Sequence, residues 1–182
     1  MFKNSHCCLS SALCLAFSLS LFANLALPEL SAVPKVDLNR YLGLWYEIAR
    51  FPNKHQVDCL KTTAQYSQQN DGTITVKNSC TVADGKFKEA TGIAKVEDKT
   101  SMSKLKVSFV PGWLRFFGIG WGNYWIIELD SEYQYAVVSE PKREYLWVLS
   151  RTPMMSKDSY DGIISRLQKN GFDTSRLIVS AQ

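Results

Sequence analysis

Histidine is nearly absent from this chain of 182 residues, which contains two. Cysteine is also scarce beyond the N-terminus, because three of the five cysteines fall within the first 14 residues. No histidine, cysteine and carboxylate spacing typical of a metal site appears, and no nucleophile motif appears either. We therefore expect no metal, no cofactor and no catalytic residues.

An excess of one charge is lacking as well. Lys and Arg number 21 and Asp and Glu number 17, a net charge of +4, and no basic cluster stands out. The sequence thus predicts no nucleic-acid partner. Hydrophobic residues make up 46% and aromatic residues 12% of the chain, which excludes disorder and is enough for one domain with a core.

The N-terminal part of the chain carries one long hydrophobic run. Lys3 precedes an almost uncharged stretch over residues 7–27, and small residues follow it. This order is typical of a secretory signal peptide. We expect cleavage near Ala32, with Ala26 as the alternative site.

This hydrophobic run has two other interpretations. It approaches the length that spans a bilayer, so an uncleaved anchor helix is an alternative. A lipid-modified cysteine needs small residues before it, whereas Cys14 follows Leu13 in the middle of the run, which disfavours lipidation. We expect a signal peptide over residues 1–32 and one mature domain over residues 33–182.

Cys59 and Cys80 are the two cysteines that remain after this segment. An even pair in an exported chain suggests a disulfide, and a hairpin turning at Asp71-Gly72 would bring the two near each other. The alternative is two unpaired buried thiols.

Short strands with short links fill the middle of the chain. The predicted strands are 43–50, 62–69, 73–80, 87–97, 104–110, 123–130, 135–140 and 144–151. Eight consecutive strands predict an all-β fold, an eight-stranded antiparallel up-and-down barrel. Such a barrel has no free edges, and its interior is wide enough for one small ligand.

The ends of this series carry further predictions. In the first strand, alternation places Trp45, Glu47 and Ala49 on one face and Tyr46, Ile48 and Arg50 on the other. A helix from about Ser156 to Lys169 has one apolar stripe, so we expect it to pack on the outside of the barrel. Residues 177–179 are predicted to form a short final strand.

Two motifs that frame the series occur together in a known family. They are Tyr41-Leu42-Gly43-x-Trp45-Tyr46-Glu47-Ile48-Ala49-Arg50-Phe51 along the first strand and Tyr145-Leu146-Trp147-x-Leu149-Ser150-Arg151-Thr152-Pro153 along and after the last. With the Asp130-Ser131-Glu132-Tyr133 turn and the following helix, residues 36–182 resemble the lipocalins. The resemblance is to the bacterial branch, which includes apolipoprotein D and plant temperature-induced lipocalins. It implies a location in the periplasm or at the outer membrane, or secretion if the source is eukaryotic.

The resemblance also implies roles for particular residues. Gly43, Trp45 and Arg151 would form the barrel floor, with Arg151 packed across the Trp45 ring. Inward-facing residues would line a site for a fatty acid or a lysophospholipid, carried without catalysis. These predicted lining residues are Tyr66, Val76, Asn78, Leu105, Val107, Phe109, Tyr124, Ile126, Val138, Tyr145 and Trp147. A filled core shows the same alternation, so packing is the alternative for each of them.

Other functions stay open at this stage. Glu47, Glu128 and Glu140 are also predicted to face inward, where buried carboxyls can act as acid or base, so an enzyme acting on a lipid is one alternative. A partner-binding module without a small ligand is another. The chain is expected to be a monomer or a homodimer.

The stretch from Pro111 to Gly122 is unusual for a loop, because it is rich in large apolar residues and has Arg115 as its only charge. These apolar residues include Trp113, Leu114, Phe116, Phe117 and Trp121. Strand directions counted from Trp45 place the loop at the open end of the barrel. It either folds over the mouth as a lid or also docks on a membrane or a second subunit. We expect docking, because Trp is favoured at lipid interfaces and Arg pairs with phosphate.

Overall fold

The computed structural model of the chain describes residues 27–181. The signal-peptide prediction rests mainly on residues 1–26, which lie outside the described residues. Within the described part, no helix is long and apolar enough to cross a membrane.

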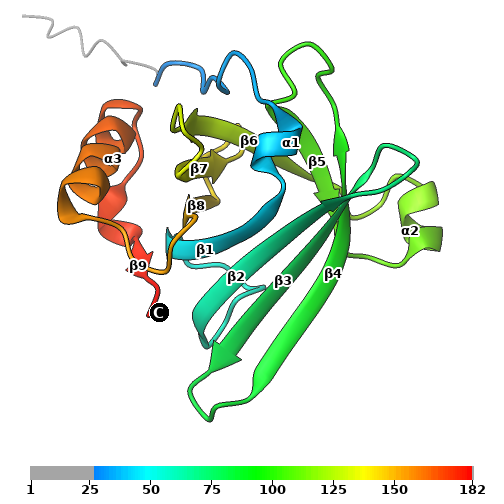
Figure 1. Cartoon of the computed structure of the whole chain (residues 1–182), viewed down its shortest axis with the longest axis horizontal. Coiled ribbons are helices and arrows are strands. Elements are labelled where there is room, and N and C mark those ends of the chain that lie inside the picture. The colour runs from blue at the N-terminus through cyan, green and yellow to red at the C-terminus, as the bar shows by residue number, and fades with distance from the viewer. Residues whose placement is uncertain (1–26, 182) are drawn as a thin grey trace, which may run out of the picture.

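Eight antiparallel strands form a closed barrel (Figure 1). The strands are β1 (Gly43–Arg50), β2 (Cys59–Gln68), β3 (Ile74–Val82), β4 (Phe87–Val96), β5 (Lys104–Ser108), β6 (Gly122–Leu129), β7 (Tyr135–Ser139) and β8 (Leu146–Ser150). Each strand pairs with the next along the chain, and β1 also pairs with β8, which closes the barrel. The predicted fold is confirmed, with strand ends that shift by a few residues.

A helix packs on the outside of the barrel, as predicted. Helix α3 spans Lys157–Lys169, and the hydroxyl of its N-cap residue Ser156 accepts a hydrogen bond from a backbone N–H of the first turn. Ile163 and Leu167, from its apolar stripe, are buried in a cluster with Val148 of β8. Figure 1 shows α3 beside this wall of the barrel.

After α3 the chain returns to the barrel. It forms the 3-10 helix η1 (Thr174–Arg176) and the short strand β9 (Ile178–Val179). Strand β9 pairs with Ala49 and Arg50 at the end of β1, beyond the residues that pair with β2. It therefore extends the sheet where β1 and β2 separate.

A β-bulge in β1 reverses the predicted alternation. One extra residue follows Glu47, so Ala49 lies opposite Val148 and Arg50 lies opposite Trp147. Trp147 packs against the interior cluster, whereas Val148 belongs to the cluster under α3. The prediction that Ala49 faces inward and Arg50 outward is therefore wrong. Ala49 packs under α3, and Arg50 is inside the barrel, 5% exposed.

A second bulge lies in β6, between Ile126 and Glu128. Ile126 is fully buried in the interior, but Glu128 pairs with Val137 on the outer face. Its carboxylate accepts hydrogen bonds from Arg166 Nε of α3 at 2.7 Å and from the Tyr135 hydroxyl at 3.2 Å. The prediction that Glu128 faces inward is wrong for the same reason.

The segment before β1 closes one end of the barrel, where the short helix α1 (Leu38–Tyr41) lies (Figure 1). Further upstream, Leu30 is 6% exposed and belongs to the cluster between the barrel and α3. Cleavage at Ala32 would remove Leu30 from this cluster, whereas cleavage at Ala26 would keep it. The position of the cleavage site stays a prediction.

Candidate functional site

The floor of the barrel is built around the fully buried Trp45 side chain. The Arg151 guanidinium lies 3.8 Å from the centre of the indole ring, a cation–π contact, and donates a hydrogen bond to the Leu44 carbonyl oxygen at 2.9 Å. Trp45 Nε1 donates to the Tyr41 carbonyl oxygen at 2.8 Å. Gly43 has φ +96°, a conformation that favours glycine, and a Cβ there would lie 3.4 Å from the guanidinium. The contacts expected of Gly43, Trp45 and Arg151 are present.

Three tyrosines meet above this floor. The Tyr124 hydroxyl lies 2.7 Å from that of Tyr41 and 2.9 Å from that of Tyr66. Burial raises the pKa of all three phenols, that of Tyr66 to about 12. The sequence placed Tyr66 and Tyr124 inside but missed Tyr41, because its inward direction depends on how α1 crosses the floor.

This cluster predicts alkaline destabilisation. The usual tyrosine pKa is near 10, so between about pH 10 and 12 the native state holds more protons than the unfolded chain, and stability falls as the pH rises. For Tyr66 alone the loss reaches about 3 kcal/mol. Denaturant unfolding at pH values across this range should show that Tyr66→Phe loses less unfolding free energy than Tyr46→Phe. Tyr46, on the outer face of β1, is the control. Equal losses in the two variants would contradict the assignment.

The predicted lining residues all lie on inward-facing positions, but at two levels. Five are buried in the packed interior cluster: Tyr66, Val76, Leu105, Ile126 and Val138. Six are half-buried or exposed: Asn78, Val107, Phe109, Tyr124, Tyr145 and Trp147. The first set forms an apolar base, and the second set borders the part of the interior that solvent reaches. Ligand contact by either set remains a prediction.

The interior is open to solvent along β3 and β4. Ala90 of β4 pairs with the inward residue Asn78, yet it is exposed to solvent. Gly92, two residues nearer the base, would place a Cβ only 2.7 Å from the Phe109 ring, so glycine leaves room for that ring on the inner wall. Phe109 itself is 41% exposed. The upper barrel is therefore an open cup with an apolar rim.

A buried polar network occupies the part of the wall where β1 ends. Arg50 Nη1 lies 3.2 Å from Glu47 Oε1, and both side chains are almost fully buried. Gln56 donates to the Glu47 carboxylate at 2.5 Å and accepts from Trp147 Nε1 at 2.8 Å. The Ser180 hydroxyl donates to Glu47 at 2.6 Å. Sequence reasoning missed Arg50 and Gln56, because the bulge turns Arg50 inward and Gln56 lies in a loop without periodicity.

The predicted disulfide between Cys59 and Cys80 is present and joins the start of β2 to the end of β3. Arg50 Nη2 donates to the Cys59 carbonyl oxygen at 3.2 Å, so the network and the disulfide hold the same corner of the barrel.

The three carboxyls that support an enzyme do not meet. Glu47 belongs to the buried network and Glu128 lies on the outer face. Glu140 accepts hydrogen bonds from the backbone N–H groups of Lys142 and Glu144, at 2.7 and 2.6 Å, so its carboxylate stabilises the β7–β8 turn. No group of three or more His, Cys, Asp or Glu suited to a metal ion occurs within residues 27–181.

The loop between β5 and β6 contains a short helix that was not predicted, α2 (Gly112–Phe116). The Trp121 ring lies 4.9 Å from Lys95 Nζ, and Lys95 is on the outer face of β4, because its neighbour Ala94 is in the interior cluster. The loop thus folds outward, as the position of α2 in Figure 1 shows. In this structure the loop therefore does not fold over the mouth as a lid.

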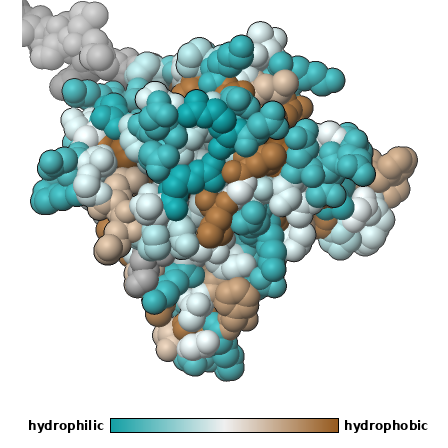
Figure 2. All heavy atoms as spheres, in the orientation of Figure 1, coloured by the Kyte–Doolittle hydropathy of each residue, from teal (hydrophilic) through white to brown (hydrophobic). Residues whose placement is uncertain are grey.

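The tip of this loop is exposed. Trp113 is 67% exposed, Phe116 86% and Phe117 70%, while Leu114 and Trp121 are half-buried beneath them. Figure 2 shows hydrophobic surface at the outer edge of the molecule on the side where α2 lies in Figure 1. The five residues predicted for docking therefore form one apolar patch, which we call the α2 patch.

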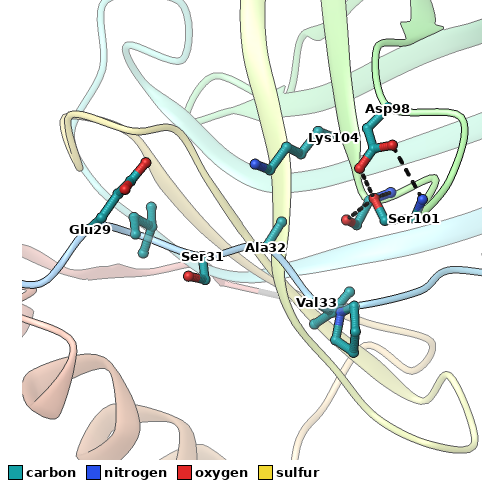
Figure 3. A pocket seen from close by; sticks show the side chains of 10 residues that line it. Glu29, Ser31, Ala32, Val33, Asp98, Ser101 and Lys104 are labelled. Carbon is teal, nitrogen blue, oxygen red and sulfur yellow. Dashed lines mark hydrogen bonds between the residues drawn. The ribbon is translucent and has the colours of Figure 1, made fainter.

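A polar cleft of about 330 Å³ lies outside the barrel, between residues 29–34 and the β4–β5 loop (Figure 3). The hydroxyls of Ser101 and Ser103 are already paired, since Ser101 Oγ lies 2.7 Å from Asp98 Oδ2 and 2.7 Å from Ser103 Oγ. The Val36 N–H donates to the Ser101 carbonyl oxygen at 2.7 Å. The N-terminal segment thus forms one side of the cleft and is held against the β4–β5 loop on the other side.

Comparison with known proteins agrees with this geometry. Residues 36–182 match the family described as "Lipocalin-like domain". The chain is 42% identical over 161 residues to the outer membrane lipoprotein Blc of Vibrio cholerae, covering 87% of this chain and 90% of that protein. It is 39% identical over 152 residues to temperature-induced lipocalin-1 of Arabidopsis thaliana, covering 82% and 81%.

Solved structures agree on the fold. Insecticyanin from the tobacco hornworm Manduca sexta superimposes with a TM-score of 0.67 at 21% identity, covering 86% of each chain. Lipocalin barrels hold one small hydrophobic ligand in their interior. From the floor contacts, the closed eight-stranded barrel and the match over residues 36–182, we conclude that this chain belongs to the lipocalin family.

Proposed function

We propose that the protein is an exported carrier that holds one single-chain amphiphile, a fatty acid or a lysophospholipid, in the cup of its barrel. The observation that supports this most is the pair of levels in the interior, an open cup above a packed apolar base. The tail lies against the cup wall, where each buried methylene contributes about 0.8 kcal/mol. The charged head group stays near the mouth, because burying it without partners is costly.

A fluorescent fatty acid tests this proposal. Trp147→Ala is expected to weaken binding about tenfold, because the half-buried indole borders the cup and its removal takes away apolar contact area. Trp113→Ala is the matched control, since Trp113 is 67% exposed outside the barrel, and its affinity should equal that of the wild type. If delipidated wild-type protein binds neither fatty acid nor lysophospholipid probes, the carrier proposal is wrong.

We propose a carrier rather than an enzyme. Glu47, the carboxyl inside the barrel, is held by Arg50, Gln56 and Ser180 and belongs to a structural network. Incubation with lysophospholipids and esters should yield no hydrolysis. Turnover by the wild type that Glu47→Gln abolishes would establish an enzyme instead.

We further propose that the α2 patch docks the carrier on an anionic bilayer. Exposed Trp and Phe side chains are favoured at a lipid interface. Arg115 and Lys95 flank the patch, and both cations would attract lipid phosphates to it. Docking would bring the carrier to the membrane whose lipids it collects.

Sedimentation with vesicles tests docking. Wild-type protein should sediment with vesicles containing phosphatidylglycerol, and the double variant Trp113→Ser/Phe117→Ser should stay in the supernatant. Gel filtration of both proteins tests whether a second copy covers the patch instead. A wild type that ignores vesicles, or a dimer that the double variant converts to a monomer, would contradict membrane docking.

A further inference from the structure

Two buried donors on the inner wall have no hydrogen-bond partner within the described residues, the Nε of Arg50 and the hydroxyl of Thr62. Their residues are 5% and 6% exposed. Buried donors in folded proteins are nearly always paired, and an unpaired one destabilises the free protein. Such donors are expected where a ligand supplies the missing acceptor.

Both donors lie at the same corner of the barrel. Arg50 donates to the Cys59 carbonyl oxygen at 3.2 Å, and Cys59 is disulfide-bonded to Cys80. Cys80 pairs with Thr62 across β2 and β3. Thr62 faces inward because Ala64, two residues further along β2, belongs to the interior cluster. Arg50 and Thr62 thus border one polar site near the mouth.

The other two unpaired buried groups lie elsewhere. Ser108 Oγ and Trp125 Nε1 belong to residues that alternate with the inward residues Leu105, Val107 and Tyr124, so both are on outer-face positions of β5 and β6. They can serve as controls, because each is an unpaired polar group that does not face the barrel interior.

We propose that Arg50 and Thr62 bind the negatively charged oxygen atoms of the ligand head group, a carboxylate or a phosphate on a single acyl chain. This inference rests on the proposed carrier function and adds the head-group chemistry. A guanidinium and a hydroxyl both donate hydrogen bonds, which are strongest to charged oxygens. The Glu47 carboxylate does not repel such a group strongly, because it accepts from Arg50, Gln56 and Ser180. Trp147 lies opposite Arg50 on β8, between this site and the cup, so an acyl chain could run past it.

The site predicts a preference for acids that depends on Thr62. Wild-type protein should bind palmitic acid and lysophosphatidic acid more tightly than hexadecanol and monopalmitoylglycerol, the neutral counterparts. Thr62→Val should weaken binding of both acids about tenfold and leave the neutral lipids unchanged. It should not lower the unfolding midpoint, because the hydroxyl has no partner to lose. Ser108→Ala is the control that removes an unpaired hydroxyl from the outer face and should change no affinity.

The outcomes separate the two proposals. If acids and neutral lipids bind the wild type equally, or Thr62→Val leaves the acid affinity unchanged, the head-group site is refuted while the carrier function stands. If only one of the two acids shows the preference, it identifies the head group as carboxylate or phosphate. If none of the four lipids binds, the carrier function itself fails. Arg50→Gln should also lose the acid preference, although it removes the partner of Glu47 and so requires a check of folding.

Discussion

Replacing Trp45 with alanine is expected to lower the free energy of unfolding by about 3–5 kcal/mol, among the largest losses that a single substitution causes. Trp45 is fully buried, so its removal leaves a cavity at the floor. The substitution also takes away the ring beneath the Arg151 guanidinium and the indole N–H that satisfies the Tyr41 carbonyl oxygen. Chemical denaturation of the purified variant measures the loss.

Trp113→Ala is the control for the same residue type. Its side chain is 67% exposed, so unfolding should change by no more than about 0.5 kcal/mol. A loss below about 1 kcal/mol for Trp45→Ala would show that the floor does not depend on the indole, and would contradict the structural role given to Trp45.

Removing the disulfide should have the second largest effect. Cys59 and Cys80 are 21 residues apart, and a loop of that length constrains the unfolded chain by roughly 3 kcal/mol in the chain-entropy account. We expect the double variant Cys59→Ala/Cys80→Ala to lose about that much stability. The loop before β2 should also become more mobile, because Arg50 is anchored to the Cys59 carbonyl oxygen.

Reductant gives the matched control for this prediction. Wild-type protein should be destabilised by reductant, whereas the double variant should not respond to it. If reductant changes neither the mass nor the unfolding midpoint of the wild type, the two thiols are unpaired in solution and the prediction is wrong.

Strand alternation predicted the barrel well because it is a local pattern. In Lys104–Ser108 each apolar residue faces the interior, and the sequence shows this directly. The floor was predictable for a different reason, since Gly43, Trp45 and Arg151 belong to motifs that resemble a known family.

Alternation failed where a bulge adds one residue to a strand. The extra residues after Glu47 and Ile126 arise from how β1 pairs with β8 and β6 with β7, which no local pattern encodes. As a result Arg50 was predicted outside and Glu128 inside. The polar site formed by Arg50 and Thr62 could therefore not be predicted from the sequence, because Arg50 was expected on the outer face.

The loop that contains α2 was also predicted only in part. Its composition predicted an exposed apolar surface, and the exposed Phe116 and Phe117 agree with that. The predicted position at the open end is not supported, because Trp121 lies on Lys95, next to Ala94 of the packed base. Its direction depends on the contact of Trp121 with Lys95 on the outer wall, a pairing across strands that composition does not contain.

Native mass spectrometry of the purified protein tests the carrier function most directly. The protein should retain one single-chain lipid, or take up one fatty acid or lysophospholipid after delipidation, with a stoichiometry of one per chain. A protein that carries no lipid after purification and takes up neither class when it is added would contradict the carrier account.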